Sequence, residues 1–282
     1  MPTTADKRRA FRRLHETGCF VMPNPWEVGA ARYLQHLGFE ALATTSAGAA
    51  FAMGLPDTDW VVPRDAMLAH IRLLAAASDV PVNADFESGY AHEPEKVAEN
   101  VTLCVETGVA GLSIEDSTGD RTTPLYARDH AVARIRAARA AIDRSGTDVV
   151  LTARTECFVA GCPDLDEAIR RLVAYAEAGA DCLFAPGIGT REQIGAVVGA
   201  VAPKPVNVLV GAGMGLTVAD LAALGVRRIS VGSALARAAW GGFIRTARRI
   251  AESGRFDSLA DAVPYGELND FFRNDLKRRA SS

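Results

Sequence analysis

Two acidic residues, Asp85 and Glu87, stand two positions apart at the end of a short apolar run that begins at Pro81. The run is typical of a buried strand, in which side chains at positions i and i+2 point the same way. Both carboxylates are therefore expected to converge just beyond the C-terminal end of that strand. Two like charges held so close require a cation, and Mg2+ suits them because it binds one or two carboxylates and keeps several waters. The stretch predicts a Mg2+ site, with a solvated polar turn as the alternative.

A weak internal repeat indicates how these acids are positioned. Four glycines each follow an amphipathic helical stretch and precede a strand-type residue by four positions: Gly38, Gly108, Gly179 and Gly225. A glycine at a helix C-terminus lets the chain turn in a left-handed conformation and start the next strand. Leu112 follows Leu42 by 70 residues and precedes Leu183 by 71. One further strand within each interval makes the repeating unit about 35 residues, the size of a strand plus a helix.

The intervening strands complete eight units of one strand and one helix. We expect these strands at Cys19–Pro23, Val80–Asp85, Val149–Arg154 and Pro205–Val210. Helices are expected at Trp26–Leu37, Arg64–Ala77, Glu93–Thr107, Arg128–Arg144, Leu165–Ala178, Arg191–Val201, Val218–Leu224 and Ser233–Ser253. Eight such units predict a (β/α)8 barrel, with a doubly wound open sheet as the alternative.

The domain organisation follows from the absence of any linker-like tract. Residues 1–258 are predicted to form the barrel, and residues 259–282 a helical extension of the same domain. The extension has an apolar face that must be covered, formed by Leu268, Phe271, Phe272 and Leu276.

The composition is that of a soluble globular protein, with 49% apolar and 23% charged residues. A net charge of -3 gives no electrostatic reason to expect nucleic acid, and the basic clusters at 8–13 and 277–279 are interpreted as solvated helix faces. No apolar run is long enough to cross a membrane, and the charged N-terminus is unlike a secretory signal. Five cysteines without C-x-x-C pairing favour a reducing compartment, so we expect a cytoplasmic protein. The five histidines are expected to be helix or surface residues rather than ligands.

Reactive groups gather at the C-terminal ends of the strands in this kind of barrel. The expected rim carries eight polar residues: Ser46, Asp85, Glu87, Glu115, Asp116, Arg154, Glu156 and Asn207. The arginine and the asparagine stand opposite the acids, as a small anionic substrate that bridges a metal would require. No Walker or G-x-G-x-x-G phosphate motif is present, and no histidine falls at a strand end, so a Ser-His-Asp or Cys-His nucleophile cannot be assembled.

Six short motifs, in order and at matching spacing, resemble the isocitrate lyase/phosphoenolpyruvate mutase superfamily. They are Thr45–Gly48, Gly54–Asp57, Asp85–Tyr90, Ser113–Asp116, Thr152–Glu156 and Pro205–Val208. The resemblance runs from about Phe11 to Ala238 and implies a barrel that binds Mg2+, or Mn2+ as a substitute, together with a 2-oxo acid. It also implies an enolate, formed while a C–C or P–C bond is broken or made. A homotetramer, a dimer of dimers that exchange the last helix, is implied as well.

The resemblance implies a role for each site residue. Ser46 and the backbone amides of Ala47 and Gly48 bind the substrate carboxylate. Arg154 contacts the oxyanion, and Asn207 contacts the far carboxylate or the leaving half of the substrate. Four acids surround the metal and its waters: Asp57, Asp85, Glu87 and Glu115. Asp85, Glu87 and Glu115 are the expected metal ligands. Asp57 and Glu115 are expected to act with Arg154 in catalysis.

The chain departs from the superfamily in the segment after Glu115. The lyases carry Lys-x-Cys-Gly-His there and the mutases Lys-x-Asn-Ser, whereas residues 117–124 read Ser-Thr-Gly-Asp-Arg-Thr-Thr-Pro. Isocitrate and methylisocitrate lyase activities are therefore disfavoured, as is ordinary mutase activity. We expect residues 117–126 to form a closing lid in which Arg121 serves catalysis by clamping an anionic group, with a solvated loop residue as the alternative.

The favoured function is that of an Mg2+-dependent enzyme acting on a small 2-oxo acid or related dicarboxylate, as a C–C lyase or decarboxylase of the oxaloacetate type. Two alternatives stay open. One is P–C bond chemistry, as in a phosphonopyruvate hydrolase or phosphoenolpyruvate mutase, and the other is a barrel that binds its ligand without catalysis. The expected partners are a small anionic substrate and further copies of the chain, but neither nucleic acid nor a membrane.

Overall fold

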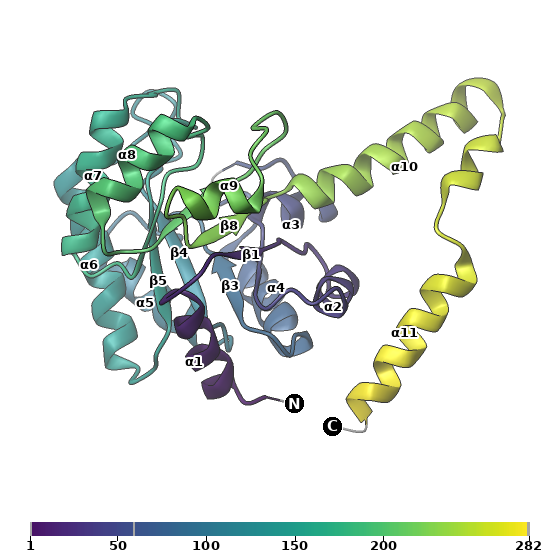
Figure 1. Cartoon of the computed structure of the whole chain (residues 1–282), viewed down its shortest axis with the longest axis horizontal. Coiled ribbons are helices and arrows are strands. Elements are labelled where there is room, and N and C mark those ends of the chain that lie inside the picture. Colours follow the sequence, from purple (N-terminus) through teal and green to yellow (C-terminus); the bar gives the residue numbers. More distant parts are fainter. Residues whose placement is uncertain (1, 59, 281–282) are drawn as a thin grey trace. The chain divides into compact units, whose positions relative to one another are not determined.

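The computed structural model describes residues 2–58 and 60–280. Residues 2–233 form one compact unit, and residues 234–280 belong to another. The larger unit is built on a single sheet of eight parallel strands (Figure 1). The strands are β1 (Phe20–Met22), β2 (Leu42–Ala43), β3 (Val82–Asp85), β4 (Gly111–Glu115), β5 (Val150–Arg154), β6 (Cys182–Phe184), β7 (Val206–Leu209) and β8 (Arg228–Ser230).

The order of the strands shows that the sheet curls into a nearly closed barrel. Each strand pairs with its neighbour in sequence from β2 to β8, and β8 then pairs with β1. The two remaining edges meet through a backbone hydrogen bond, in which Ala43 N donates to Pro23 O at 3.1 Å. The Asn24 side chain adds a second link by donating to Thr44 O at 2.9 Å. The predicted (β/α)8 barrel is confirmed, and the open sheet is excluded.

Helices follow the strands at nearly the predicted positions. In the larger unit they are α2 (Val28–His36), α3 (Ser46–Ala52), α4 (Arg64–Ala77), α5 (Pro94–Val105), α6 (Arg128–Arg144), α7 (Leu165–Glu177), α8 (Arg191–Val201) and α9 (Val218–Ala223). The predicted glycines do end helices with a positive φ, for example +91° at Gly108 and +102° at Gly179. Among the described helices that follow a strand, only the short α3 between β2 and α4 was missing from the predicted set.

An additional helix, α1 (Thr4–Leu14), packs against the N-terminal end of the barrel. Its fully buried Phe11 joins a cluster of interior side chains that includes Phe20 and Met22 of β1. The prediction of a solvated basic face is wrong for two of its arginines. Arg8 donates to the backbone oxygens of Val105 and Val109, and Arg12 pairs with Asp181 at 3.2 Å.

The smaller unit consists of α10 (Ala234–Ser253), the 3-10 helix η1 (Asp257–Asp261) and α11 (Tyr265–Ala280). The last helix was predicted to begin at Leu259 but begins six residues later, after Pro264. Several large apolar side chains of α11 are exposed, including Leu268 at 41% and Leu276 at 60%. None of the helices in the described chain is both long and apolar enough to cross a membrane.

Candidate active site

The C-terminal ends of the strands surround two connected cavities. The upper cavity, about 410 Å³, is lined by side chains that include Asp57, Glu87, Glu115, Arg121, Arg154 and Glu156. The inner cavity, about 210 Å³, lies within the barrel and is lined by side chains that include Asn83, Asp85, Arg154, Asn207, Arg228 and Ser230. Ser46, Asp57 and Arg154 line both cavities, so the two form one continuous site.

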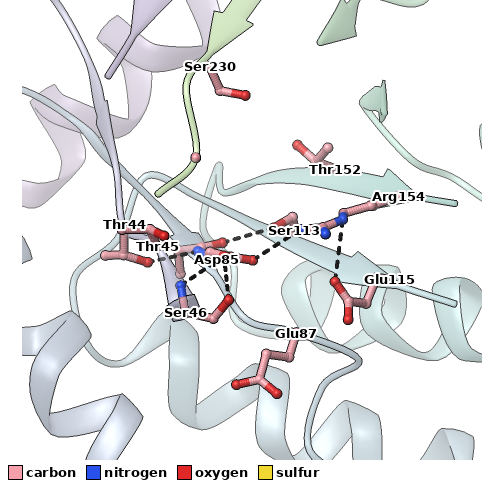
Figure 2. A network of polar contacts seen from close by, with 12 residues as sticks. Thr44, Thr45, Ser46, Asp85, Glu87, Ser113, Glu115, Thr152, Arg154 and Ser230 are labelled. Carbon is pink, nitrogen blue, oxygen red and sulfur yellow. Dashed lines mark hydrogen bonds and ion pairs between the residues drawn. The ribbon is translucent and has the colours of Figure 1, made fainter. Parts of the chain in front are cut away.

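Arg154, the last residue of β5, is the centre of the charged network in this site (Figure 2). Its guanidinium lies 3.6 Å from an Asp85 oxygen and 3.4 Å from a Glu115 oxygen, and it donates to Glu156. It also lies over the ring of Phe184, 5.3 Å from the ring centroid. The surrounding carboxylates outweigh the effect of burial and raise the pKa of Arg154 well above its usual value, so this cation is permanent.

Asp85 connects this arginine to the start of α3. One of its oxygens faces Arg154, and the other accepts from both the backbone N–H and the hydroxyl of Ser46, each at 3.0 Å. The backbone amide of Gly48 donates to Thr45 Oγ1 at 3.2 Å. Two of the three predicted carboxylate-binding groups are therefore engaged within the protein, whereas Ala47 lines the inner cavity.

Glu87 is held by a strained piece of backbone. β3 ends at Asp85, so strand alternation does not decide where Glu87 points; its own φ is +47°. Trp60 N donates to one of its oxygens at 3.0 Å and Tyr90 Oη to the other at 2.6 Å. Trp60 and Tyr90 also have positive φ angles, of 56° and 55°, a conformation that costs energy for residues other than glycine. Burial raises the pKa of Glu87 to about 7.

Glu115, the last residue of β4, is a largely buried acid beside Arg154. Burial raises the pKa of its carboxyl well above the usual value; nearby Arg154 opposes this effect, while Glu156 and Asp85 reinforce it. Glu156 was predicted to lie on the rim but was given no role. In the structure its carboxylate accepts from Arg154 Nε and so helps to orient that guanidinium.

Asp116 was also predicted to lie on the rim, but it points away from both cavities. Its carboxylate is buried and accepts four hydrogen bonds, from Thr155 Oγ1, Glu156 N, Arg171 and Tyr175 Oη, at 2.6 to 3.1 Å. The reason is that neighbouring residues on an extended chain face opposite sides, so Asp116 faces the helices when Glu115 faces the site. Asp116 thereby fixes the chain just beyond Arg154.

The segment predicted to be a lid is an ordered loop next to the upper cavity. Ser117 and Leu125 form an antiparallel bridge, and Tyr126 N donates to Asp116 O at 3.0 Å where the loop rejoins the barrel. Arg121 lies at the exposed tip and lines the upper cavity. Asp57 approaches the same cavity from the segment between α3 and α4, and its charge contributes to the raised pKa of Glu87.

The inner cavity contains one functional candidate, Arg228, that the sequence did not suggest. Asn207 was predicted, and its Nδ2 donates to Ser230 Oγ at 2.9 Å. Its Oδ1 accepts from the Nε of Arg228, also at 2.9 Å. Arg228 stands two residues before Ser230 in β8, so a strict reading of strand alternation would have placed both side chains inside the barrel.

The oxygen donors of the rim suit a hard divalent ion. In the described part of the chain, no three His, Cys, Asp or Glu side chains already stand together as a metal site. Each candidate ligand is instead held by protein donors: Asp85 by Ser46 and Arg154, and Glu87 by Trp60 and Tyr90. Burial raises the pKa values of Glu87 and Glu115, and a bound cation would offset this effect by favouring their charged forms. Carboxylates fit Mg2+ better than a soft metal.

The fold and the rim define the chain as a (β/α)8 barrel of the kind that has its reactive groups at the C-terminal mouth. The model of the phosphoenolpyruvate phosphomutase family matches residues 11–251, and the chain belongs to this family.

Relatives of known sequence span nearly the same length. An uncharacterised protein of Mycobacterium tuberculosis is 33% identical over 263 residues, which cover 92% of this chain and 94% of that protein. An oxaloacetate decarboxylase of Paraburkholderia xenovorans is 32% identical over 240 residues, covering 83% of this chain and 77% of the decarboxylase.

Solved structures agree with this assignment. A Burkholderia cenocepacia protein, assigned only to the lyase/mutase class, is 50% identical with a TM-score of 0.91, covering 95% of this chain and 96% of that one. A 2,3-dimethylmalate lyase of the superfamily is 28% identical with a TM-score of 0.85, covering 100% and 98%. A phosphonopyruvate hydrolase in complex with oxalate and Mg2+ has the same identity and TM-score, with 97% of each chain covered. The resemblance to the isocitrate lyase/phosphoenolpyruvate mutase superfamily is confirmed.

Proposed function

We propose that the protein is an Mg2+-dependent lyase that cleaves a C–C bond in a small 2-oxo acid, with decarboxylation of an oxaloacetate-type substrate as the favoured reaction. The observation that carries this proposal is the position of Arg154, a permanent cation surrounded by three carboxylates at the junction of two cavities. A negative charge that develops on a substrate oxygen beside this guanidinium is stabilised without reorganisation of the protein.

The proposed metal ligands are Asp85, Glu87 and Glu115, with Asp57 nearby on the upper cavity. When bound there, Mg2+ would act as a Lewis acid on the 2-oxo and carboxylate oxygens of the substrate. Support comes from the oxygen-only donor set described above and from the phosphonopyruvate hydrolase relative solved with Mg2+. Mn2+ is expected to substitute, because it accepts the same ligands.

The protein's own groups would act as follows during decarboxylation. The carboxylate next to the 2-oxo group binds to Ser46 and to the amides of Ala47 and Gly48, where it replaces Asp85 as the acceptor of the Ser46 donors and Thr45 as the acceptor of the Gly48 amide. Asn207 holds the carboxylate that leaves. The bond between that carboxylate and its neighbouring carbon breaks, CO2 departs, and the electron pair passes into the 2-oxo group. Arg154 stabilises the resulting enolate oxygen, and a proton from solvent in the upper cavity converts the enolate to the 2-oxo acid product.

P–C bond chemistry is the second candidate, supported by the similarity to phosphonopyruvate hydrolase. We favour C–C cleavage because a phosphonate dianion in the upper cavity would require more positive charge there than a carboxylate. Arg154 already faces three acids, and Arg121 lies on an exposed loop. The leaving group of a decarboxylation is neutral CO2, which makes no such demand.

The test is a screen of 2-oxo acids with and without Mg2+, in which pyruvate and phosphate release are both measured. Metal-catalysed decarboxylation without enzyme is subtracted. We expect EDTA to abolish turnover and Mg2+ to restore it, and Arg154→Ala to lower kcat by roughly 100-fold or more. Arg154→Lys, which retains the charge, and Arg144→Ala, at an exposed position on α6, are the controls for folding and for loss of an arginine.

Three outcomes decide between the candidates. Pyruvate released from oxaloacetate in an Mg2+- and Arg154-dependent manner supports the proposal. Phosphate released from phosphonopyruvate at a higher rate than pyruvate from oxaloacetate supports P–C chemistry instead. Binding of these ligands without release of either product indicates a barrel that has lost catalysis.

We also propose that the chain forms a homotetramer, a dimer of dimers, in which α11 packs onto a neighbouring copy. The support is the exposed apolar surface of that helix, which includes Leu268, Phe272 and Leu276 at 40–60% exposure. Contiguous apolar patches on a soluble protein usually mark an interface.

A further inference from the structure

Arg228 is a buried cation in the wall of the inner cavity. Its side chain is 1% exposed and projects from β8 into the barrel interior. Burial lowers its pKa, and the nearby Cys182, itself a neutral thiol whose pKa burial raises, supplies no negative charge to offset this effect. Buried charges are normally paired, because leaving water is costly for an isolated ion. Among the described residues, the printed contacts of Arg228 include no carboxylate, and the Asp85 that lines the same cavity pairs with Arg154 instead.

The hydrogen bonds of Arg228 are all made to neutral groups. Its guanidinium donates to Asn207 Oδ1 at 2.9 Å and to Thr152 Oγ1 at 3.0 Å, and it lies 3.3 Å from His15 Nε2. These three partners come from β7, β5 and the residue after α1, so Arg228 is fixed from three sides. A guanidinium has donors but no acceptor.

This contact determines which way the Asn207 amide points. Because Arg228 can only donate, Asn207 must present its oxygen to it, and its Nδ2 therefore faces the opposite way. One hydrogen of that Nδ2 goes to Ser230 Oγ. Since Asn207 and Ser230 both line the inner cavity, the amide is held as a donor on the cavity side.

We propose that Arg228 is a positioning residue that makes Asn207 an obligate hydrogen-bond donor and biases the inner cavity toward a substrate with a second carboxylate. The proposal rests on the proposed function, which already has a diacid substrate, and adds how the second carboxylate of that substrate is recognised. The diacid's second carboxylate accepts from Asn207 and supplies negative charge near Arg228. The cavity of about 210 Å³ has room for such a group, since one water takes up about 30 Å³ of liquid volume.

The experiment compares two probes by calorimetry in the presence of Mg2+: oxalate, which has no second arm, and 3,3-difluorooxaloacetate, a C4 diacid. In Asn207→Asp a carboxylate replaces the amide beside Arg228 and supplies the missing counter-charge, so we expect the variant to keep or raise the Tm. The same change replaces a donor by a repelling acceptor. We therefore expect at least tenfold weaker diacid binding and oxalate affinity within twofold of wild type.

A second variant tests the positioning role directly. Arg228→Met removes the cation that orients the amide, and we expect at least fivefold weaker diacid binding with oxalate affinity retained. Arg227→Met is the matched control, because Arg227 is the neighbouring residue and donates outside the cavity, to Gly18 O. If Arg228 had a purely structural role, Arg228→Met would weaken the binding of both probes equally. Should Arg228→Met fail to fold, the two-probe comparison in Asn207→Asp decides.

The outcomes separate this inference from the function on which it rests. If the wild-type protein binds both probes and either Asn207→Asp or a folded Arg228→Met retains full diacid affinity, the proposed role of Arg228 is overturned. The proposed function is not affected by that result. Wild-type protein that binds neither probe with Mg2+ overturns the proposed function, and the inference with it. Selective loss of diacid binding in both variants, with Arg227→Met unchanged, supports the proposal.

Discussion

His15 is expected to make the protein sensitive to mild acid. Its ring lies between Phe11 and Phe20, at centroid distances of 4.7 and 5.2 Å, and its Nδ1 is 2.8 Å from Phe11 O. Because Arg228 can only donate, His15 Nε2 must accept from it, and Nδ1 must carry the proton. His15 is the C-cap residue of α1, as the expectation of a helix or surface residue allows, although its ring is partly buried. Burial first, and then the charge of Arg228, lowers its pKa to about 3, with Arg12 adding to this effect and Asp181 opposing it.

The size of the effect follows from the difference between the two pKa values of His15. In the unfolded chain the imidazole binds a proton below its ordinary pKa of 6.5, whereas in the folded protein it stays neutral down to about pH 3. The unfolded state therefore binds more protons between these pH values, and stability falls as the pH falls through 6.5. Between pH 8 and pH 5, the interval below the ordinary pKa of 6.5 is about 1.5 pH units. At about 1.4 kcal/mol per unit, the free energy of unfolding falls by about 2 kcal/mol.

The assay is urea unfolding at fixed protein concentration, followed by circular dichroism at pH 8 and at pH 5. Other groups also titrate in this range, so the informative quantity is the difference between wild type and His15→Gln, which is neutral at both pH values and can still accept from Arg228. We expect the variant to lose about 2 kcal/mol less than wild type on acidification. His36→Gln, at an exposed site on α2, should retain the wild-type pH dependence. Equal losses in wild type and His15→Gln would refute the assigned burial and tautomer of His15.

Three further predictions concern the rest of the chain. Asp116→Ala should lower the Tm by roughly 6 °C or more, because four donors, among them Arg171 and Tyr175, lose their buried acceptor; a calorimetric scan that matches wild type would contradict the four-bond network. Arg121→Ala should raise KM and lower kcat/KM about tenfold, about 1.4 kcal/mol, with Mg2+ affinity unchanged, and wild-type kinetics would leave Arg121 without a clamping role. Deletion from Leu259 onward should reduce the number of subunits measured by light scattering, and an unaltered assembly would exclude α11 from the interface.

Much of the architecture could be predicted from local patterns in the sequence. The bounds of α4, α6 and α8 were predicted to the residue, and the glycines at the helix ends marked the following strands. These features depend on periodicity and on backbone conformations that are determined within a few residues. The polar residues at the strand ends were recognised for the same reason, since a parallel barrel brings those ends together whatever the side chains contact.

Side-chain direction beyond the strands was not determined locally. Asp85 ends β3 as expected, but Glu87 points where its left-handed backbone and its bonds to Trp60 and Tyr90 direct it. Asp116 resembled another rim acid, yet it is held among the helices by donors as far along the chain as Tyr175. In both cases the deciding partners come from other elements, so no pattern around the residue itself revealed them.

The sequence by itself determined the alternation of strands and helices, and with it the barrel and the set of residues at its mouth. Tertiary structure alone decided which charges are buried and what they contact. Arg228 was not singled out in the sequence, and His15 was expected only to be a helix or surface residue, although the two lie 213 positions apart and contact each other in the folded protein. The free energy of a buried charge depends on all of the groups around it, and only the folded chain brings those groups together.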